Sequence, residues 1–175
     1  LWLFNLVGTA KTARILEVFT YAYRRYGVTA FVVDSLAKCG IAEDDYIGQK
    51  AFVERLCDFA NEFNVHVHLV IHVRKQQDEN KHTGKMDVKG TGAMTDLAFN
   101  NIVVWRNKPK EEERRNGGAI DDSKPDALFI CDKQRNHDWE GRIKLWYHPA
   151  SQQFIEAPDA APVQFVKFPE RGWVQ

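Results

Sequence analysis

The stretch that decides the fold reads TAFVVD and runs from Thr29 to Asp34. It is a short run of apolar and β-branched residues that ends abruptly in a carboxylate, which is typical of a strand buried in a sheet. A second run, VHVHLVI from Val65 to Ile71, has the same character and closes on His72. The sequence therefore predicts two buried strands, each with a polar side chain at its carboxyl end.

Helical periodicity precedes both strands. From about Thr12 to Tyr26, apolar residues recur at every third or fourth position, and Gly27 follows as a stop signal. The same spacing returns from about Asp45 to Asn64. Helices that alternate with continuous apolar strands predict an α/β fold with a mostly parallel sheet that is covered on both faces.

The rest of the chain contains further strands and polar segments. Residues 107–125 are polar and charge-dense, which favours a solvated surface loop, and residues 157–175 are predicted to be an irregular C-terminal tail. No helical pattern separates the last two predicted strands, so the sheet is expected to end in antiparallel strands. Short apolar runs predict strands at Leu1–Leu6, Asn101–Arg106, Ala127–Lys133 and Arg142–His148.

The composition is that of an ordinary soluble globular protein. The 175 residues are 44% hydrophobic and 27% charged, which excludes a disordered chain. No apolar run approaches the roughly 20 residues of a membrane span, so no membrane partner is expected. The 24 basic residues balance the 24 acidic ones, so any surface that binds nucleic acid must be local.

Cysteine and histidine patterns do not favour a metal site. The cysteines are far apart in apolar contexts, which indicates reduced thiols in a cytoplasmic protein. Three histidines fall in one strand-like run, where the first two share a face and the third could join them. No carboxylate or cysteine lies nearby in the sequence to complete a ligand set. The residues concerned are Cys39, Cys57, Cys131, His66, His68 and His72.

Asp34 and His72 are the first candidates for chemistry. Both follow predicted parallel strands, and open α/β sheets bind ligands at the carboxyl edge of such strands. An aspartate there can hold Mg²⁺, usually through water, because a hard cation prefers oxygen ligands. A neutral hydrogen-bond donor there, such as the His72 imidazole, can bind a γ-phosphate. When that phosphate leaves, the following loop can change its conformation. The alternatives are an aspartate that caps a loop and a core histidine that is bound to backbone.

Two basic segments are candidates for phosphate contacts. Lys133 and Arg135 lie two apart on a predicted strand and project to the same side, as an arginine finger and its lysine would. The alternative is an exposed basic strand end. The segment from Arg74 to Gly92 combines cations with glycines, which suits gripping of a nucleic-acid backbone, although a plain solvated loop is the alternative. Its candidate residues are Arg74, Lys75, Lys81, Lys85, Lys89, Gly90 and Gly92.

The segment GTAKT from Gly8 to Thr12 imitates the end of a phosphate-binding loop. That motif needs a glycine directly before its lysine and another five residues earlier. Here those positions hold Ala10 and Asn5. The segment is therefore not interpreted as a phosphate-binding loop, despite its similarity to one.

Taken in order, these segments resemble the helicase family that includes bacterial DnaB, the phage primase–helicases and the mitochondrial helicase Twinkle. The similarity spans about Leu3 to Phe154. It is carried by Gly8 after the opening strand, VVD ending at Asp34, VIHVRK ending at Lys75, KGTGA from Lys89, LAFNNIVVWR ending at Arg106, and KQRN from Lys133.

The resemblance implies a RecA-like three-layer core in residues 1–156, truncated at its N-terminal side. Asp34 matches the magnesium-associated Walker B aspartate, and His72 matches the γ-phosphate sensor of the phage and Twinkle branch. Residues 74–92 match the central-channel loop that holds single-stranded DNA. Lys133 and Arg135 match the cations that act on the nucleotide of a neighbouring subunit. Arg106 and Tyr147 fall where some members clamp the adenine base.

By the same resemblance, the intact protein is a hexameric ring that hydrolyses ATP or another nucleoside triphosphate with Mg²⁺ and translocates on single-stranded DNA. The resemblance also implies an attached primase domain. The expected location is the cytoplasm of a bacterial or phage-infected cell. The phosphate-binding loop and the acidic residue that polarises water are expected upstream of Leu1, so this chain alone is not expected to hydrolyse nucleotide efficiently. The alternatives are a RecA-type recombinase, another RecA-like ATPase, and a non-catalytic module for oligomerisation or DNA binding.

Overall fold

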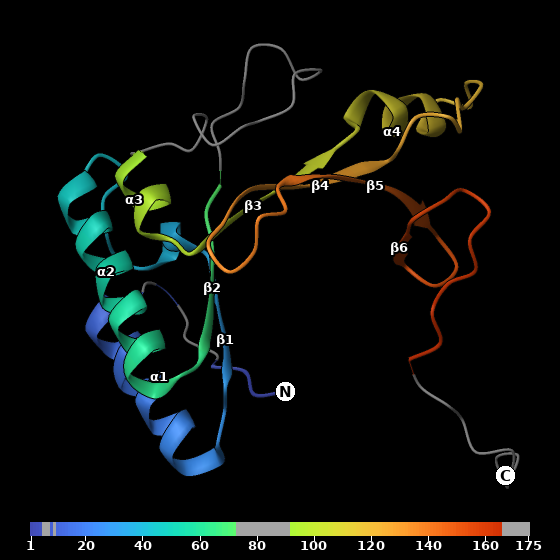
Figure 1. Cartoon of the computed structure of the whole chain (residues 1–175). Coiled ribbons are helices and arrows are strands. Elements are labelled where there is room, and N and C mark those ends of the chain that lie inside the picture. The colour runs from blue at the N-terminus through green and yellow to red at the C-terminus, as the bar shows by residue number, and fades with distance from the viewer. Residues whose placement is uncertain (5–7, 9, 73–91, 166–175) are drawn as a thin grey trace, which may run out of the picture. The chain divides into compact units, whose positions relative to one another are not determined.

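The computed structural model describes residues 1–4, 8, 10–72 and 92–165. The chain divides into two compact units (Figure 1). The first unit comprises Leu1–Asn101 and Asp132–Glu140, and the second comprises Ile102–Cys131 and Gly141–Gln175. Within the described ranges, no helix has the length and apolar character that crossing a bilayer demands.

The first unit joins helices to a small parallel sheet. Strands β1 and β2 pair in parallel, in a register that runs from Ala30 opposite His66 to Asp34 opposite Val70. This pairing confirms the predicted alternation of helices with parallel strands. The elements are α1 (Thr12–Tyr26), β1 (Ala30–Asp34), the 3-10 helix Leu36–Lys38, α2 (Tyr46–Phe63), β2 (His66–Val70) and α3 (Gly92–Leu97).

Local capping explains where the two long helices begin and end. The Asp45 carboxylate accepts a hydrogen bond of 2.8 Å from the backbone N–H of Gly48, which satisfies one of the free amides at the start of α2. Helix α1 ends at Gly27, whose φ of 65° is the left-handed conformation that glycine adopts without steric cost. The stop predicted at Gly27 is confirmed.

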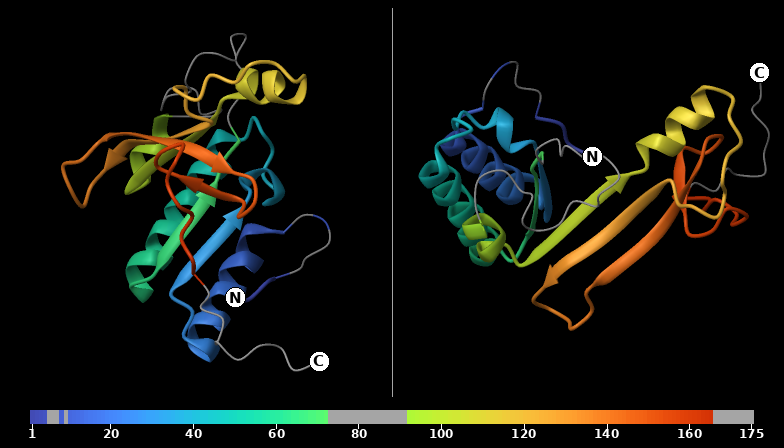
Figure 2. Two further views of the ribbon diagram at one scale, coloured as in Figure 1. Left: turned by 90° about the vertical axis from the view of Figure 1, so that its right-hand side faces the viewer. Right: turned by 90° about the horizontal axis from the view of Figure 1, so that it is seen from above.

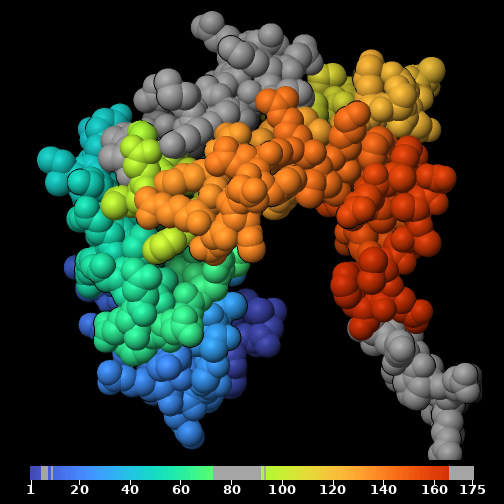
Figure 3. All heavy atoms as spheres, viewed as in Figure 1, coloured from blue at the N-terminus to red at the C-terminus, as the bar shows by residue number. Residues whose placement is uncertain are grey.

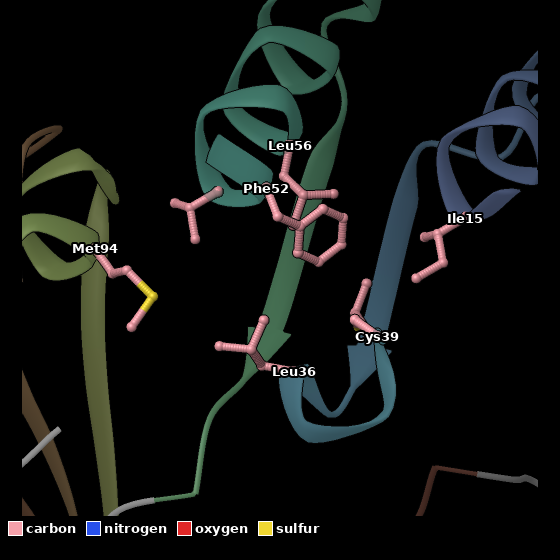
Figure 4. Packing of buried hydrophobic residues seen from close by; sticks show 8 residues of the cluster. Ile15, Leu36, Cys39, Phe52, Leu56 and Met94 are labelled. Atoms are coloured by element: carbon pink, nitrogen blue, oxygen red, sulfur yellow. The ribbon is translucent and has the colours of Figure 1, made fainter. Parts of the chain in front are cut away.

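The core of the first unit lies between the sheet and its helices (Figure 4). Along β1, Phe31 and Val33 are buried, whereas Val32 on the opposite face is 63% exposed. The helices thus cover one face, and the described residues place no helix on the other. The RecA-like three-layer core therefore stays a prediction. The buried cluster consists of Ile15, Val33, Leu36, Cys39, Phe52, Val53, Leu56 and Met94.

The second unit is built on an antiparallel ribbon (Figure 2). The strand order of its four-stranded sheet is β3-β4-β5-β6, with Ala127 of β4 opposite Leu145 of β5. The expected antiparallel ending of the chain is confirmed, and residues 157–165 contain no helix or strand. The elements are β3 (Asn100–Arg106), α4 (Lys108–Arg115), β4 (Ala127–Gln134), β5 (Gly141–His148) and β6 (Gln153–Ile155).

The predicted strand at Leu1–Leu6 is wrong for the residues that can be compared. Residues 1–4 form no strand, and residues 5–7 lie outside the described residues. Instead of pairing with a strand, this segment places the Trp2 ring against Tyr26, with ring centroids 4.2 Å apart. A short apolar run does not form a strand without a neighbouring backbone to pair with.

The prediction of a surface loop throughout residues 107–125 is also wrong, because α4 occupies its first half. The Asn107 side chain accepts a hydrogen bond from the backbone N–H of Lys110, and Pro109 lies in the first turn, where its missing N–H costs nothing. Glu111 near the start and Arg114 near the end complement the helix dipole. The charge run is therefore a capped helix.

Candidate functional site

The structure brings Asp34 and His72 to one edge of the sheet. Asp34 is the last residue of β1 and lies opposite Val70, the last residue of β2. His72 follows Val70 by two residues, so both polar side chains occupy the carboxyl end of parallel neighbours. Both residues are exposed. This is the juxtaposition that the sequence predicts for a site that contacts phosphate or Mg²⁺.

Asp34 and His72 are the metal- and phosphate-facing side chains that the sequence predicts at this edge. No group of three or more His, Cys, Asp or Glu side chains in the described ranges is arranged to hold a metal. A lone exposed carboxylate such as Asp34 would hold Mg²⁺ through water, with phosphate oxygens completing the shell. The peptide bond from Asp34 to Ser35 is cis, and Ser35 is buried directly behind the carboxylate-bearing residue.

Lys133 and Arg135 hold the carboxyl end of α3 within the same unit. The Lys133 ammonium donates hydrogen bonds of 2.8 Å to the backbone carbonyls of both Thr95 and Asp96. The Arg135 guanidinium donates one of 2.7 Å to the Asp96 carbonyl and lies 5.4 Å from the centre of the Phe99 ring. The negative end of a helix dipole attracts such cations. Both predicted phosphate ligands thus have partners in their own chain.

Two further side chains complete this cap of α3. The Asn101 amide donates to the Thr95 carbonyl at 3.0 Å, and the Cys57 thiol donates to the Leu97 carbonyl at 3.9 Å. Burial raises the pKa of Cys57, and neighbouring acidic groups add to this effect, whereas Arg135 and Lys133 act in the opposite direction. Sequence reasoning missed α3, and it missed the cap because the cations lie 37 to 39 residues from the carbonyls that they contact.

Arg106 and Tyr147, the predicted adenine clamp, have separate partners in the second unit. Arg106 makes a bidentate ion pair with Glu111, with Nε–Oε1 and Nη2–Oε2 distances of 3.0 and 2.7 Å. This hydrogen bonding raises the pKa of Arg106. The Tyr147 ring lies 5.3 Å from that of Phe154. Among the described residues, no hydrogen bond, ion pair or ring contact joins Arg106 to Tyr147, so their shared role stays a prediction.

An ion cluster of Lys110, Arg114 and Asp126 holds α4 against the sheet of the second unit. Asp126 Oδ1 lies 3.2 Å from Lys110 Nζ and 3.0 Å from Arg114 Nη2, and Oδ2 accepts a hydrogen bond of 2.9 Å from the Tyr147 N–H. Burial alone would raise the pKa of Asp126, but the Tyr147 hydrogen bond and the two cations outweigh it and lower that pKa. The sequence presents these residues only as parts of a charge run.

Most of the predicted DNA-contacting residues lie outside the described residues. These are Arg74, Lys75, Lys81, Lys85, Lys89 and Gly90. Gly92 is the exposed first residue of α3, and its carbonyl accepts a hydrogen bond of 2.8 Å from the Thr95 hydroxyl.

His66 and His68 lie on the uncovered face of β2, with ring centroids 4.3 Å apart. Burial lowers the pKa of His68, and the neighbouring His66 adds to this shift. No third ligand among the described residues accompanies the pair. The interpretation of these histidines as metal ligands, which the sequence disfavours, therefore gains no further support.

Comparisons with known proteins do not assign the chain to a family. No protein-family model matches it. No curated protein matches it either.

Proposed function

We propose that this chain is part of the ATP-driven motor of a ring-shaped replicative DNA helicase or primase–helicase that translocates on single-stranded DNA. The observation that carries the proposal is the parallel pairing of β1 and β2, with Asp34 and His72 at one edge. Nucleotide-hydrolysing α/β proteins use such an edge to meet their ligand. The order of motifs along the chain, which resembles that family of helicases, supplies the remaining support.

In this proposal, the two strand ends share one nucleotide. Asp34 would hold, through water, the Mg²⁺ that accompanies the triphosphate, and this ion would supply charge neutralisation for the phosphates. The His72 imidazole donates a hydrogen bond to the γ-phosphate. When that phosphate leaves, His72 loses its partner and the segment that follows it, residues 74–92, changes its hold on single-stranded DNA.

Lys133 and Arg135 would act on the nucleotide of the neighbouring subunit. To do so they must exchange the α3 carbonyls for phosphate oxygens. The exchange is favourable in charge, because hydrogen bonds between two ionised groups are stronger than those to a neutral acceptor. A hexameric ring places such a pair at each interface, and zero net charge is compatible with a ring whose basic residues line only its channel.

The test uses the longest gene product that contains this sequence, including a phosphate-binding loop. We expect Arg135→Ala to reduce DNA-stimulated hydrolysis by about 10³–10⁵-fold, the range measured for arginine fingers, while nucleotide binding persists. Arg142→Ala on β5 is the matched control, since Arg142 is also an exposed arginine next to the same hairpin. Unchanged turnover in Arg135→Ala would remove Arg135 from the site.

One observation favours a second candidate, a non-catalytic module for oligomerisation or DNA binding. Both basic side chains are already engaged within their own chain, as expected if they serve only to stabilise α3. In that case Arg135→Ala lowers the stability of the first unit and leaves hydrolysis unaffected. Measuring both quantities on the same variant separates the two candidates.

A further inference from the structure

A groove runs along the outer surface between α1 and α2. Its volume is about 550 Å³, and it is shallow and largely open to solvent. The two helices pack side by side on the same face of the β1–β2 sheet, and α2 forms the green and teal surface in Figure 3. The lining consists of Ala13, Leu16, Glu17, Thr20, Tyr21 and Arg24 from α1 and Arg55 from α2.

The lining residues of α1 form one stripe with helical spacing. From Ala13 to Arg24 the stripe is about 16 Å long, or about three turns. Its floor is apolar or small, with Ala13, Leu16 and the methyl-bearing Thr20, whose hydroxyl is already used in a hydrogen bond to the Leu16 carbonyl. The dimensions and the floor therefore suit another helix that inserts apolar side chains every third or fourth residue.

The two arginines that line the groove have no ion-pair partner among the residues that the structure describes. Arg24 and Arg55 are exposed, and neither forms an ion pair or hydrogen bond with any other residue that the structure describes. The only carboxylate in the lining, Glu17, is held at 2.9 Å by Arg14 outside the groove. Two guanidinium groups therefore flank the apolar floor and are available to carboxylates of a bound partner.

Exposed aromatic rings stand at the Arg24 end of the stripe. Tyr21 is 58% exposed, and its ring meets the half-exposed Tyr26 edge-to-face at 5.9 Å. Tyr26 in turn stacks on Trp2, which is 64% exposed. Tyrosine, tryptophan and arginine are the residues enriched where protein interfaces concentrate their binding energy.

We propose that this groove binds an amphipathic helix of a partner protein, whose apolar stripe enters the groove and whose flanking acidic residues meet Arg24 and Arg55. The proposal rests on the groove, its floor and its unpartnered arginines, and does not depend on a motor function. A helix of about three turns with apolar residues at positions i, i+3 or i+4 and i+7 matches the stripe in length and spacing. Acidic residues beside that stripe match the charge.

The experiment uses the full chain and two synthetic 14-residue peptides labelled with fluorescein. Both carry leucine at helical spacing; one has glutamate and the other lysine at the flanking positions. Fluorescence anisotropy is expected to show binding of the glutamate peptide with a Kd on the order of 10 µM. The double variant Arg24→Glu/Arg55→Glu should weaken this binding at least about 10-fold and should prefer the lysine peptide, because the charges are exchanged.

The matched control is Arg115→Glu/Arg142→Glu, which changes the same charge at exposed arginines outside the groove. It should keep the affinity for the glutamate peptide within about 2-fold. Tyr21→Ser tests the rim without changing charge and should weaken binding by about 10-fold. Circular dichroism confirms that each variant remains folded.

Three results would overturn the proposal. The first is equal binding of both peptides to the wild-type chain, or equal loss in the groove and control variants. The second is that the glutamate peptide does not bind, whereas fluorescent oligo(dT) binds and loses affinity in Arg24→Glu/Arg55→Glu. That result would assign the groove to nucleic acid. The third is a dimer, detected by sedimentation, that Arg24→Glu/Arg55→Glu dissociates, which would assign the groove to a second copy of the chain.

Discussion

Replacing Asp126 by Asn removes the buried negative charge at the centre of the ion cluster in the second unit and leaves the exposed Asp122 carboxylate, 3.9 Å from Lys110 Nζ, as a weaker partner. The side chains of Lys110 and Asp126 are 2% and 5% exposed, so this pair is withdrawn from water. Asn retains an oxygen that can accept the Tyr147 N–H, so the substitution deletes charge while preserving shape. Its effect on stability therefore measures how strongly the two cations depend on Asp126.

The expected magnitude follows from the burial of Lys110. Removing one partner of a buried ion pair typically costs about 3–5 kcal/mol, because the other charge is left uncompensated. Here Lys110 keeps its hydrogen bond of 2.6 Å to the Lys124 carbonyl, and the Arg114 side chain is 40% exposed and can be hydrated. Both features favour the lower end of that range. We therefore expect Asp126→Asn to lower the free energy of unfolding by about 3 kcal/mol.

The assay combines urea unfolding with hydrogen exchange of peptides from residues 127–148, which report on β4 and β5. Glu111→Gln is the control, because it breaks the solvent-exposed pair with Arg106 and should cost only about 0.2–1 kcal/mol. The double variant Lys110→Met/Asp126→Asn should recover part of the loss, since no buried charge then remains between the two positions. A cost below about 1 kcal/mol for Asp126→Asn, or no recovery in the double variant, would refute this account of the cluster.

Three further outcomes are expected. Because the pKa of Asp126 is lowered in the folded state, its ionised side chain stabilises the fold fully above the ordinary aspartate pKa of about 3.9. This stabilisation is lost as the pH falls through the lower pKa of the folded state. In an acid titration, the free energy of unfolding should therefore fall less below about pH 4 in Asp126→Asn than in the wild type. Lys133→Met should lower the free energy of unfolding of the first unit by about 1–2 kcal/mol and speed hydrogen exchange in α3, because the Thr95 and Asp96 carbonyls each lose one donor and keep only Asn101 and Arg135, respectively. Replacing Lys81 and Lys85 by Ala should weaken binding of single-stranded DNA and flatten its salt dependence, and equal salt slopes would show that these lysines do not touch phosphate.

Helices α1 and α2 and the pairing of β1 with β2 were predictable from the sequence because their determinants are local, whereas α3 was missed and the strand predicted at Leu1–Leu6 was wrong. The apolar periodicity of α1 and α2 survives in the structure to within about one residue of each predicted end, a better agreement than boundaries usually allow. The position of Asp34 and His72 at one edge of the sheet also followed from the sequence, because parallel strands bring their carboxyl ends to the same edge. No contact between distant side chains was needed for either prediction.

The second unit was less predictable because its charged residues act through distant partners. In the sequence Lys110 is one of several charges in a polar run, yet it is 3% exposed, since Asp126 supplies the charge that permits its burial. A local signal for α4 did exist in Asn107 as a cap followed by Pro109. Residues 107–125 were predicted to be a loop because the polarity of the segment was given more weight than its capping residues. No local sequence pattern predicted that the Lys110 side chain is buried.

The cap of α3 links the structural and functional interpretations of the same two cations. Lys133 and Arg135 together donate three hydrogen bonds to the carbonyls of Thr95 and Asp96. If a neighbour's phosphate takes these donors, the last turn of α3 loses its countercharge, and α3 begins at Gly92, the last residue of the proposed DNA-contacting segment 74–92. Nucleotide engagement and the stability of α3 are then opposed, so a ligand that binds the two cations must loosen the helix. Inorganic tripolyphosphate added to the chain should therefore speed hydrogen exchange in α3, and an identical effect in Lys133→Met/Arg135→Ala would show that the two events are unconnected.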